Sequence, residues 1–214
     1  MDERLWSAYD AMGRDYQERA ADSGPGLYTQ ELLARGAVVM AFDASPVMVD
    51  LARARIADQA QVDQAVLGQP LPYPDGAFDV IVCALAIHYA DDRAVAFAEF
   101  WRVLRPGGAL VISTQHPTTD WLRKGGSYFD VRLETDVWHT EAGDQPVRFW
   151  REPLSALCGY ATGAGFLIEK VIEPLPAETM RGLYPDDYQK LTTEPGFLIL
   201  RLVKPRDPMA AIRP

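Results

Sequence analysis

The sequence predicts a single α/β domain built on a mostly parallel β-sheet, with helices on both faces. Short apolar segments alternate with helical segments between residues 37 and 114, and such alternation is typical of right-handed crossovers into a parallel sheet. The segment FDVIVCALAI, residues 78–87, is apolar almost throughout, as expected of a strand covered on both faces. A chain of 214 residues is long enough for one sizeable core.

The parallel part of the sheet occupies the first half of the chain. An N-terminal helix is predicted from apolar residues that recur every three or four positions, namely Leu5, Tyr9, Met12 and Tyr16. A second helix should run from Thr29 to Arg35 and end at Gly36. Four strands are expected at 37–42, about 62–67, 78–87 and 109–114.

Capping residues mark two further helices. After Asp43, Ser45 is placed as an N-cap and Pro46 as the first helical residue, where a missing N–H group costs nothing. This helix should continue to about Ile56. Asp91 or Asp92 caps the next helix, which should end at RPGG, residues 105–108.

Beyond Pro117, apolar and polar residues alternate in place of the continuous apolar segments. Alternating segments such as SYFDVRLETDVW predict an antiparallel, lid-like excursion at about 121–151. A helix over about 154–164 follows, and VIEP and GFLILRLV should close the sheet with antiparallel strands. We therefore expect one domain over 1–205 and a tail over 206–214.

The composition of the chain argues against several classes of partner and of structural site. A net charge of -9 disfavours nucleic acid and anionic membranes as partners. The two cysteines, Cys83 and Cys158, have no paired spacing, so no metal ribbon or disulfide framework is expected. The N-terminus lacks an apolar signal core, and VIVCALAI is too short to span a bilayer. We expect a cytoplasmic protein without a membrane anchor.

Three features fall near the carboxyl ends of the expected strands, where open parallel sheets bind ligands. Gly24-Pro25-Gly26 precedes a helix, so it is either an anion-binding loop or a tight turn. Asp43 ends a strand 17 positions after Gly26 and either binds ribose hydroxyls or belongs to a helix-entry turn. The third feature is PYPDGAFDVIVCALAIHY followed by FWRVLRPGGALVIST.

These segments carry a family resemblance. FDASPVMVDLARAR, LPYPDGAFDVIVCALAIHYADD and EFWRVLRPGGALVISTQHP resemble successive motifs of the class I S-adenosylmethionine-dependent methyltransferases, of the bacterial small-molecule type often labelled methyltransferase type 11. The resemblance covers residues 24 to about 117. It implies a Rossmann-like three-layer sandwich and methyl transfer from S-adenosylmethionine to a small-molecule acceptor.

The resemblance also implies a set of cofactor-binding residues. The glycine loop would hold the methionine end of the cofactor, and the acidic residue after the second family strand would hold the ribose. The adenine would pack near the end of the third family strand and beside residues that close the fourth, while the N-terminal helix would cover the cofactor. The implied residues are Gly24, Gly26, Asp43, Ala44, Val66, Leu67, Leu85, His88 and Tyr16.

The first motif of the family is altered here. Ala20 stands where the family has an acid, and the segment 17–23 contains no aliphatic residue larger than alanine, so the first central strand is missing. Burial of about four aliphatic side chains in such a strand would stabilise a domain by roughly 6 to 12 kcal/mol. We hypothesise an internal deletion. The second and fourth family strands could pair directly, another segment could fill the gap, or a partner chain could donate a strand.

Several side chains could serve the acceptor. His88 and His116 each follow an expected strand and could act as a base, although a hydrogen-bonded structural role is the commoner one for a histidine. Tyr9, Tyr128 and Trp138 could line the acceptor site, or could serve only in packing. No histidine and acid spacing indicates a metal site.

Two other functions compete with methyl transfer. A protein of this outline with a broken cofactor loop could be a non-catalytic binding or assembly protein. A nicotinamide-dependent oxidoreductase would also place an acid on the ribose, but Thr29 stands where its motif needs a third glycine. The sequence leaves a homodimer open.

Overall fold

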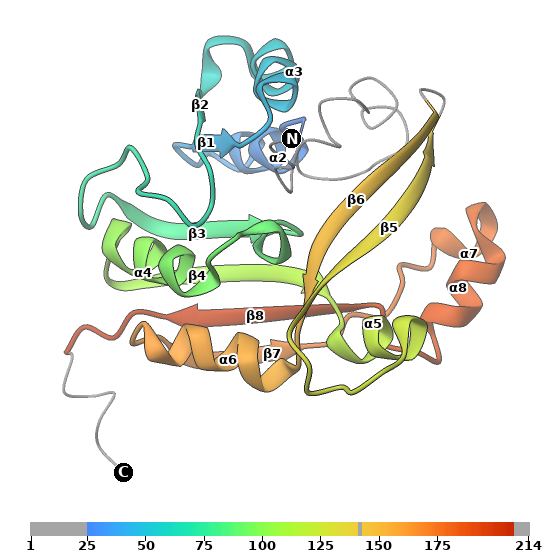
Figure 1. Ribbon diagram of the computed structural model, residues 1–214. Coiled ribbons are helices and arrows are strands. Elements are labelled where there is room, and N and C mark those ends of the chain that lie inside the picture. The colour runs from blue at the N-terminus through green and yellow to red at the C-terminus, as the bar shows by residue number, and fades with distance from the viewer. Residues whose placement is uncertain (1–24, 141–142, 208–214) are drawn as a thin grey trace. The chain divides into compact units, whose positions relative to one another are not determined.

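The computed structural model in Figure 1 describes residues 25–140 and 143–207. Their contacts divide the chain into two compact units. The first unit holds the described parts of 25–72, 89–91 and 133–149, and the second holds 73–88, 92–132 and 150–207. The N-terminal helix expected from the apolar periodicity lies outside the described residues.

The first unit begins with two helices around a pair of short parallel strands. In chain order these elements are α2 (Leu27–Ala34), β1 (Met40–Asp43), α3 (Pro46–Ile56), a 3-10 turn (Ala57–Gln59) and β2 (Gln61–Gln64). β1 pairs with β2 in parallel, with Asp43 opposite Gln64. Val49, Ala52 and Ile56 on α3 form a buried cluster with Val62 of β2.

The start of α3 agrees with the capping residues expected from the sequence. The Ser45 hydroxyl accepts a hydrogen bond from the Met48 N–H group at 3.2 Å, and Pro46 is the first helical residue, as expected. The same holds for α4 (Arg93–Val103), because the Asp92 carboxylate accepts from the Val95 N–H group at 3.0 Å. Each cap satisfies a backbone donor that the first helical turn leaves unpaired.

Most of a β-hairpin, residues 133–149, also belongs to the first unit. β5 (Arg132–Thr140) pairs with β6 (Gly143–Arg151) in a two-stranded sheet, which confirms an excursion from the main sheet. Two strands separated by two residues must run antiparallel. Trp138 and Val147 of this hairpin pack in a cluster with Met48 of α3.

The second unit contains a four-stranded sheet. Its strands are β3 (Phe78–Ala84), β4 (Leu104–Gln115), β7 (Leu167–Ile172) and β8 (Phe197–Val203), in the order β3-β4-β8-β7. β3 and β4 run parallel, whereas β8 runs antiparallel to both β4 and β7. The remaining elements are a 3-10 turn (Ile87–Tyr89), α5 (Pro117–Lys124), α6 (Leu154–Gly163), α7 (Met180–Leu183) and α8 (Pro185–Leu191).

One face of this sheet forms the core of the second unit. Leu110 and Ile112 of β4 lie opposite Leu202 and Leu200 of β8, and all four are at most 1% exposed. α4 and α6 pack against the sheet and each other (Figure 1). They contribute the buried side chains Phe97, Phe100, Leu157 and Ala161. An α/β fold with antiparallel strands at the C-terminal end is therefore confirmed.

The expectation that β3 is covered on both faces was wrong. Val80 and Val82 are 56% and 41% exposed, whereas Cys83 on the opposite face is 5% exposed. Neighbouring side chains of a strand point to opposite faces, and α4 and α6 cover only the face that carries Cys83, Leu110 and Ile112. The apolar run indicated a buried strand but could not show how many helices cover it.

The pairing of the described strands tests one of the three ways to complete the sheet without the first family strand. β1 and β2 belong to one sheet and β3 and β4 to another, so the second and fourth family strands do not pair directly in the described part of the chain. Residues 17–23 lie outside the described residues. The internal deletion and the other two ways of completing the sheet therefore stay predictions.

Candidate functional site

In the first unit, Asp43 lies at the carboxyl end of β1. Its side chain is half-buried, and Oδ1 accepts a hydrogen bond from the Ser45 N–H group at 2.8 Å. This bond fixes the carboxylate at the entrance to α3. The Asp43 carbonyl accepts from the Ala65 N–H group at 3.1 Å, which ties the end of β1 to the turn that follows β2.

The turn after β2 carries the two residues expected near an adenine. Val66 and Leu67 are half-buried, and Gln64 donates from Nε2 to the Ala44 carbonyl at 3.2 Å. The structure thus brings Asp43, Ala44, Val66 and Leu67 together at one end of the β1-β2 pair. A fixed carboxylate beside half-buried aliphatic side chains suits the ribose and adenine of a nucleoside.

Gly26 lies where helices α2 and α3 pack closely against each other. It lies at the start of α2 with φ at +87°, a conformation that favours glycine. A Cβ atom there would lie 3.0 Å from Ile56 Cδ1 and 3.3 Å from Ala52 Cα on α3. The residue therefore lets α2 approach α3 closely. Gly24, Tyr9 and Tyr16 lie outside the described residues.

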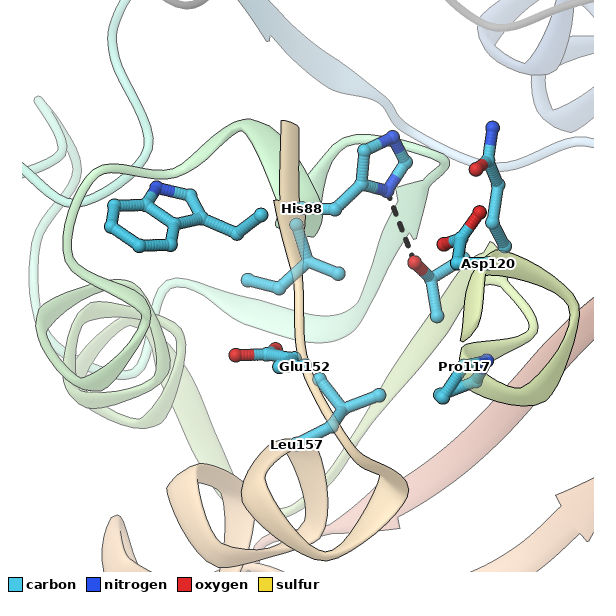
Figure 2. A pocket seen from close by; sticks show the side chains of 9 residues that line it. His88, Pro117, Asp120, Glu152 and Leu157 are labelled. Carbon is cyan, nitrogen blue, oxygen red and sulfur yellow. Dashed lines mark hydrogen bonds between the residues drawn. The ribbon is translucent and has the colours of Figure 1, made fainter. Parts of the chain in front are cut away.

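The second unit contains a pocket at the carboxyl ends of β3 and β4 (Figure 2). It is small, with room of about 20 Å³ for water-sized molecules. The lining residues come from the turn after β3, the end of β4, α5, the end of β6 and α6, and are Ile87, His88, Thr114, Gln115, Pro117, Asp120, Trp150, Glu152 and Leu157. Expected site residue His88 is among them.

His88 is buried in this pocket and neutral at physiological pH. Its Nδ1 lies 3.0 Å from Thr114 Oγ1, the hydrogen bond drawn in Figure 2. Burial lowers the pKa of His88 to about 4 because the charged imidazolium is poorly solvated there. A neutral imidazole can accept a proton, so this histidine keeps the chemical form that a general base needs.

The backbone before His88 is held in an uncommon conformation. Leu85 has φ at +47°, in the left-handed region that residues other than glycine rarely adopt. Its N–H group donates to the Ser113 carbonyl at 3.0 Å and lies 3.2 Å from the Ser113 hydroxyl. These bonds hold the turn that carries His88 against β4, and such conformations are frequent at functional sites.

A buried ion pair supports one wall of the pocket. Arg93 Nε lies 3.2 Å from Glu152 Oε2, and the two side chains are 6% and 9% exposed. The guanidinium also stacks on the Trp150 ring, 4.4 Å from its centroid, and on Tyr160 at 5.4 Å. Burial raises the pKa of Glu152, while the positive charge of Arg93 opposes this shift.

Two polar atoms of the pocket lining are shielded from solvent and have no hydrogen-bond partner within the described chain. They are Trp150 Nε1 and Gln115 Oε1. A buried donor or acceptor that stays unpaired costs about 1–3 kcal/mol. Such atoms commonly pair with a water or a ligand.

His116 has a structural position at the start of α5. Its Nδ1 accepts from the Thr118 N–H group at 3.2 Å, and its Nε2 lies 3.0 Å from Glu173 Oε1. Because Nδ1 accepts, the proton of the neutral ring is on Nε2 and is donated to Glu173. Both ring nitrogens of His116 are thus engaged within the protein.

The expected aromatic residues fall in different units. In the second unit, the Tyr128 hydroxyl accepts from the Leu154 N–H group at 3.0 Å, at the first residue of α6. In the first unit, Trp138 packs against the cluster of Met48 and Val147. No group of three His, Cys, Asp or Glu side chains in the described ranges is arranged to hold a metal ion.

Sequence reasoning missed most of the pocket. α5 was read as part of the antiparallel excursion, although Pro117 at its first position, Asp120 in its first turn and Gly125 after its end are ordinary helix signals. Arg93 and Glu152 are 59 positions apart, and no local pattern predicts their pairing. Gln115 is the last residue of β4 and comes directly after the strand expected over 109–114, a position that could have marked it as a site residue.

Part of the chain is similar in sequence to known methyltransferases. Residues 21–112 match the family model described as a methyltransferase domain. The malonyl-[acyl-carrier protein] O-methyltransferase of Serratia marcescens is 36% identical over 96 residues, which are 44% of this chain and 36% of that protein. The demethylmenaquinone methyltransferase of Deinococcus radiodurans is 37% identical over 94 residues, which are 42% of this chain and 39% of that protein. The chain thus spans well under half the length of these two curated relatives.

Solved structures share the fold over most of the chain. An S-adenosylmethionine-dependent methyltransferase from Mesorhizobium loti has a TM-score of 0.66 at 23% identity and covers 84% of this chain and 87% of its own. A putative S-adenosylmethionine-dependent methyltransferase from Listeria monocytogenes has a TM-score of 0.69 at 20% identity and covers 83% and 85%. No helix in the described part of the chain is long and apolar enough to cross a membrane. Residues 21–112 thus match a methyltransferase domain, and the fold is similar to that of solved S-adenosylmethionine-dependent methyltransferases.

Proposed function

We propose that the protein transfers a methyl group from S-adenosylmethionine to a small-molecule acceptor. The observation that carries this proposal is the position of Asp43, a half-buried carboxylate that ends β1 within the matched domain and is fixed by the Ser45 N–H group. A carboxylate held in this way can accept hydrogen bonds from both hydroxyls of a ribose. When bound, the cofactor would supply an electrophilic methyl group on a sulfonium.

The first unit would hold the nucleoside end of the cofactor. Asp43 would bind the ribose, Ala44 would contribute backbone next to it, and Val66 and Leu67 would pack against the adenine. Their proximity in the structure supports this assignment. Gly26, with Gly24, would allow the chain to approach the methionine end, and Tyr16 would cover the cofactor. Leu85 and His88, the other two residues that the family resemblance implies for the cofactor, belong to the second unit.

The acceptor would react at the carboxyl ends of β3 and β4. Methyl transfer is an in-line displacement, so the protein must align the acceptor and, where the acceptor carries a proton, remove it. His88 is the proposed base, because it lines the pocket and stays neutral above pH 4 or so. His116 is less suited to this role since both of its ring nitrogens have partners.

The acceptor's identity stays open within this proposal. Tyr9, Tyr128 and Trp138 are the other proposed acceptor contacts, and the Tyr128 hydroxyl at the start of α6 is the one nearest in sequence to a pocket-lining segment. The two curated relatives named above are described with different acceptors. The family match therefore favours methyl transfer over the nicotinamide and assembly alternatives without selecting one acceptor.

We further propose a cytoplasmic protein with a small-molecule rather than a nucleic-acid substrate, working as one domain over 1–205. The acidic charge of -9 supports the exclusion of nucleic acid. A homodimer is also proposed, because the exposed Val80 and Val82 on β3 offer apolar surface for a second copy. Light scattering coupled to size exclusion tests it, and a monomer mass at all concentrations would exclude it.

The experiment that tests the proposed function is calorimetric titration with S-adenosylhomocysteine. The folded chain should bind it with micromolar affinity, and Asp43→Ala should weaken binding by at least tenfold. Asp50→Ala is the matched control, because Asp50 lies on α3 of the same unit with 79% of its side chain exposed. No heat of binding to a chain shown to be folded by circular dichroism would overturn the proposed function.

A further inference from the structure

Thr114 and His88 form a buried contact between two side chains of the second unit. Thr114 lies near the end of β4 and is 6% exposed, and His88 in the turn after β3 is 7% exposed. Thr114 Oγ1 lies 3.0 Å from His88 Nδ1, as Figure 2 shows. A hydroxyl group can donate or accept, so this distance alone does not say which ring nitrogen carries the proton of the neutral imidazole.

The surroundings of Thr114 determine the direction of this hydrogen bond. Its backbone is used in the sheet, where Thr114 lies opposite Leu198 of β8. Within the described chain, His88 Nδ1 is the only hydrogen-bond partner of the Thr114 hydroxyl. If the hydroxyl accepted from Nδ1, its own hydrogen would be buried without an acceptor, which is costly. If it donates to Nδ1, this hydrogen is satisfied and the ring proton lies on Nε2.

The carboxylates that line the same pocket are engaged with arginines. Asp120 pairs with Arg123 at 3.3 Å, and Glu152 pairs with Arg93 at 3.2 Å. Neither carboxylate accepts a hydrogen bond from Thr114. The imidazole is therefore the acceptor that the structure provides for this hydroxyl.

We propose that Thr114 is a positioning residue that keeps the proton of neutral His88 on Nε2 and makes Nδ1 the nitrogen that takes up a proton. The hydroxyl donates to Nδ1 in the neutral ring and turns to accept from the Nδ1–H group in the imidazolium. This inference deepens the base role proposed above for His88 and rests on that function. The proton lost by the methyl acceptor ends on Nδ1, and the Nε2–H bond stays unbroken. A base that acts through Nε2 would need the other tautomer.

NMR distinguishes the two tautomers of the free protein. Long-range ¹H–¹⁵N correlations of the imidazole rings are recorded without cofactor or acceptor at pH 8, where an ordinary imidazole with a pKa of about 6.5 is neutral. The chain has three histidines, and His88→Gln identifies the signals of His88. We expect an Nδ1 without a hydrogen and a protonated Nε2.

The other two histidines are internal references for the two patterns. His116 Nδ1 accepts from the Thr118 N–H group. His139 Nδ1 lies 2.6 Å from Asp144 Oδ1 and donates to it, because an ionised carboxylate can only accept. The pattern of His88 should therefore match that of His116 and differ from that of His139.

Variants of Thr114 test its positioning role. Thr114→Val removes the hydroxyl, so the Nδ1 signal of His88 should move to the position of an unbonded nitrogen. Thr114→Ser keeps a hydroxyl and should restore the signal of the unaltered protein. Thr162→Val is the matched control and should leave the signals of His88 in place, because the exposed Thr162 hydroxyl on α6 donates to the Cys158 carbonyl at 2.9 Å. Circular dichroism checks that each variant is folded.

Two results would overturn the proposal. One is a proton on His88 Nδ1 in the unaltered protein, which would mean that the Thr114 hydroxyl donates elsewhere, to Asp120 or to a water in the pocket. The other is an Nδ1 signal that a folded Thr114→Val variant leaves unchanged. The first result is decisive even where the variant does not fold.

Titration of the same sample with S-adenosylhomocysteine separates this inference from the proposed function. If Nδ1 accepts from Thr114 and the cofactor product does not bind, the tautomer stands and the methyl-transfer function falls. If the cofactor product binds and His88 carries its proton on Nδ1, the function stands and the inference about Thr114 is wrong.

Discussion

Arg93 and Glu152 form an ion pair at 3.2 Å in which neither side chain is more than 9% exposed. The pair joins the first residue of α4 to the chain segment between β6 and α6, and it places Trp150 and Glu152 at the wall of the pocket. A charge buried in this way depends on its partner, because it cannot recover its hydration within the fold.

We expect Arg93→Met to destabilise the protein by about 3–5 kcal/mol, since it leaves the Glu152 carboxylate buried without its partner. Urea denaturation measures this loss. Adding Glu152→Gln to Arg93→Met should restore part of the stability because it removes the orphaned charge. Arg35→Met, which breaks an ion pair whose side chains are 74% and 60% exposed, should cost no more than about 0.5 kcal/mol. Equal losses for Arg35→Met and Arg93→Met would contradict the account.

His88 should make the stability of the protein sensitive to acid. Its pKa is near 6.5 when unfolded and about 4 in the fold. The unfolded state therefore binds a proton more readily between these values, and stability present above pH 6.5 is lost as the pH falls towards 4. At about 1.4 kcal/mol per pKa unit, the loss reaches roughly 3 kcal/mol.

The matched variant for this prediction is His88→Gln, which cannot take up a proton. Both proteins keep Asp120 and Glu152 in the same pocket, so the difference between the two isolates His88. Unfolding free energies at pH 7 and pH 4.5 should differ more for the unaltered protein than for the variant. Parallel pH profiles would show that His88 is not buried as described.

Gly26 and Gly36 have almost the same backbone conformation but different surroundings. Alanine at each position therefore separates the cost of the left-handed backbone from the cost of overpacking. Gly26 and Gly36 have φ at +87° and +85°, but a Cβ atom at Gly36 would meet nothing within 4 Å, whereas one at Gly26 would lie 3.0 Å from Ile56 Cδ1. Gly36→Ala should cost only the left-handed conformation, about 1–2 kcal/mol. Gly26→Ala should cost about 1–3 kcal/mol more because it also overpacks the contact between α2 and α3. Thermal unfolding of both variants checks the order, which equal losses would refute.

The two cysteines should react differently with thiol reagents. Cys83 is 5% exposed, and burial raises its pKa to about 12. Cys158 is half-buried on α6, and burial raises its pKa as well. Since the thiolate is the reactive form, iodoacetamide at pH 8 should modify Cys158 slowly and Cys83 only after unfolding. Peptide mass spectrometry distinguishes them, and rapid modification of Cys83 in the native protein would contradict its place in the core.

Local signals in the sequence predicted local structure well. Ser45-Pro46 and Asp92 fixed the starts of α3 and α4, because a cap and the N–H group that it binds lie within three residues of each other. Asp43 was likewise predictable, since it ends an apolar strand just before such a cap. These features depend only on nearby residues.

Features that depend on distant residues were not predictable. The exposure of Val80 and Val82 follows from which helices pack on the sheet, and an apolar run alone does not specify this. Trp150 and Gln115 line one pocket only because β6 and β4 end beside each other. The resemblance to methyltransferases predicted the domain match over residues 21–112 and the fold, whereas the lining of the pocket depends on how distant segments pack.

The proposed function depends on binding of the cofactor ribose by Asp43, and a thermodynamic cycle with two nucleosides measures this contact. Adenosine and 2′,3′-dideoxyadenosine are each titrated into the unaltered protein and into Asp43→Asn. The account predicts that Asp43→Asn weakens adenosine binding by about tenfold or more and leaves 2′,3′-dideoxyadenosine binding unchanged, because the lost hydrogen bonds go to the ribose hydroxyls. If both nucleosides lose the same affinity, or neither binds the unaltered protein, Asp43 does not hold the ribose and the proposed cofactor site is wrong.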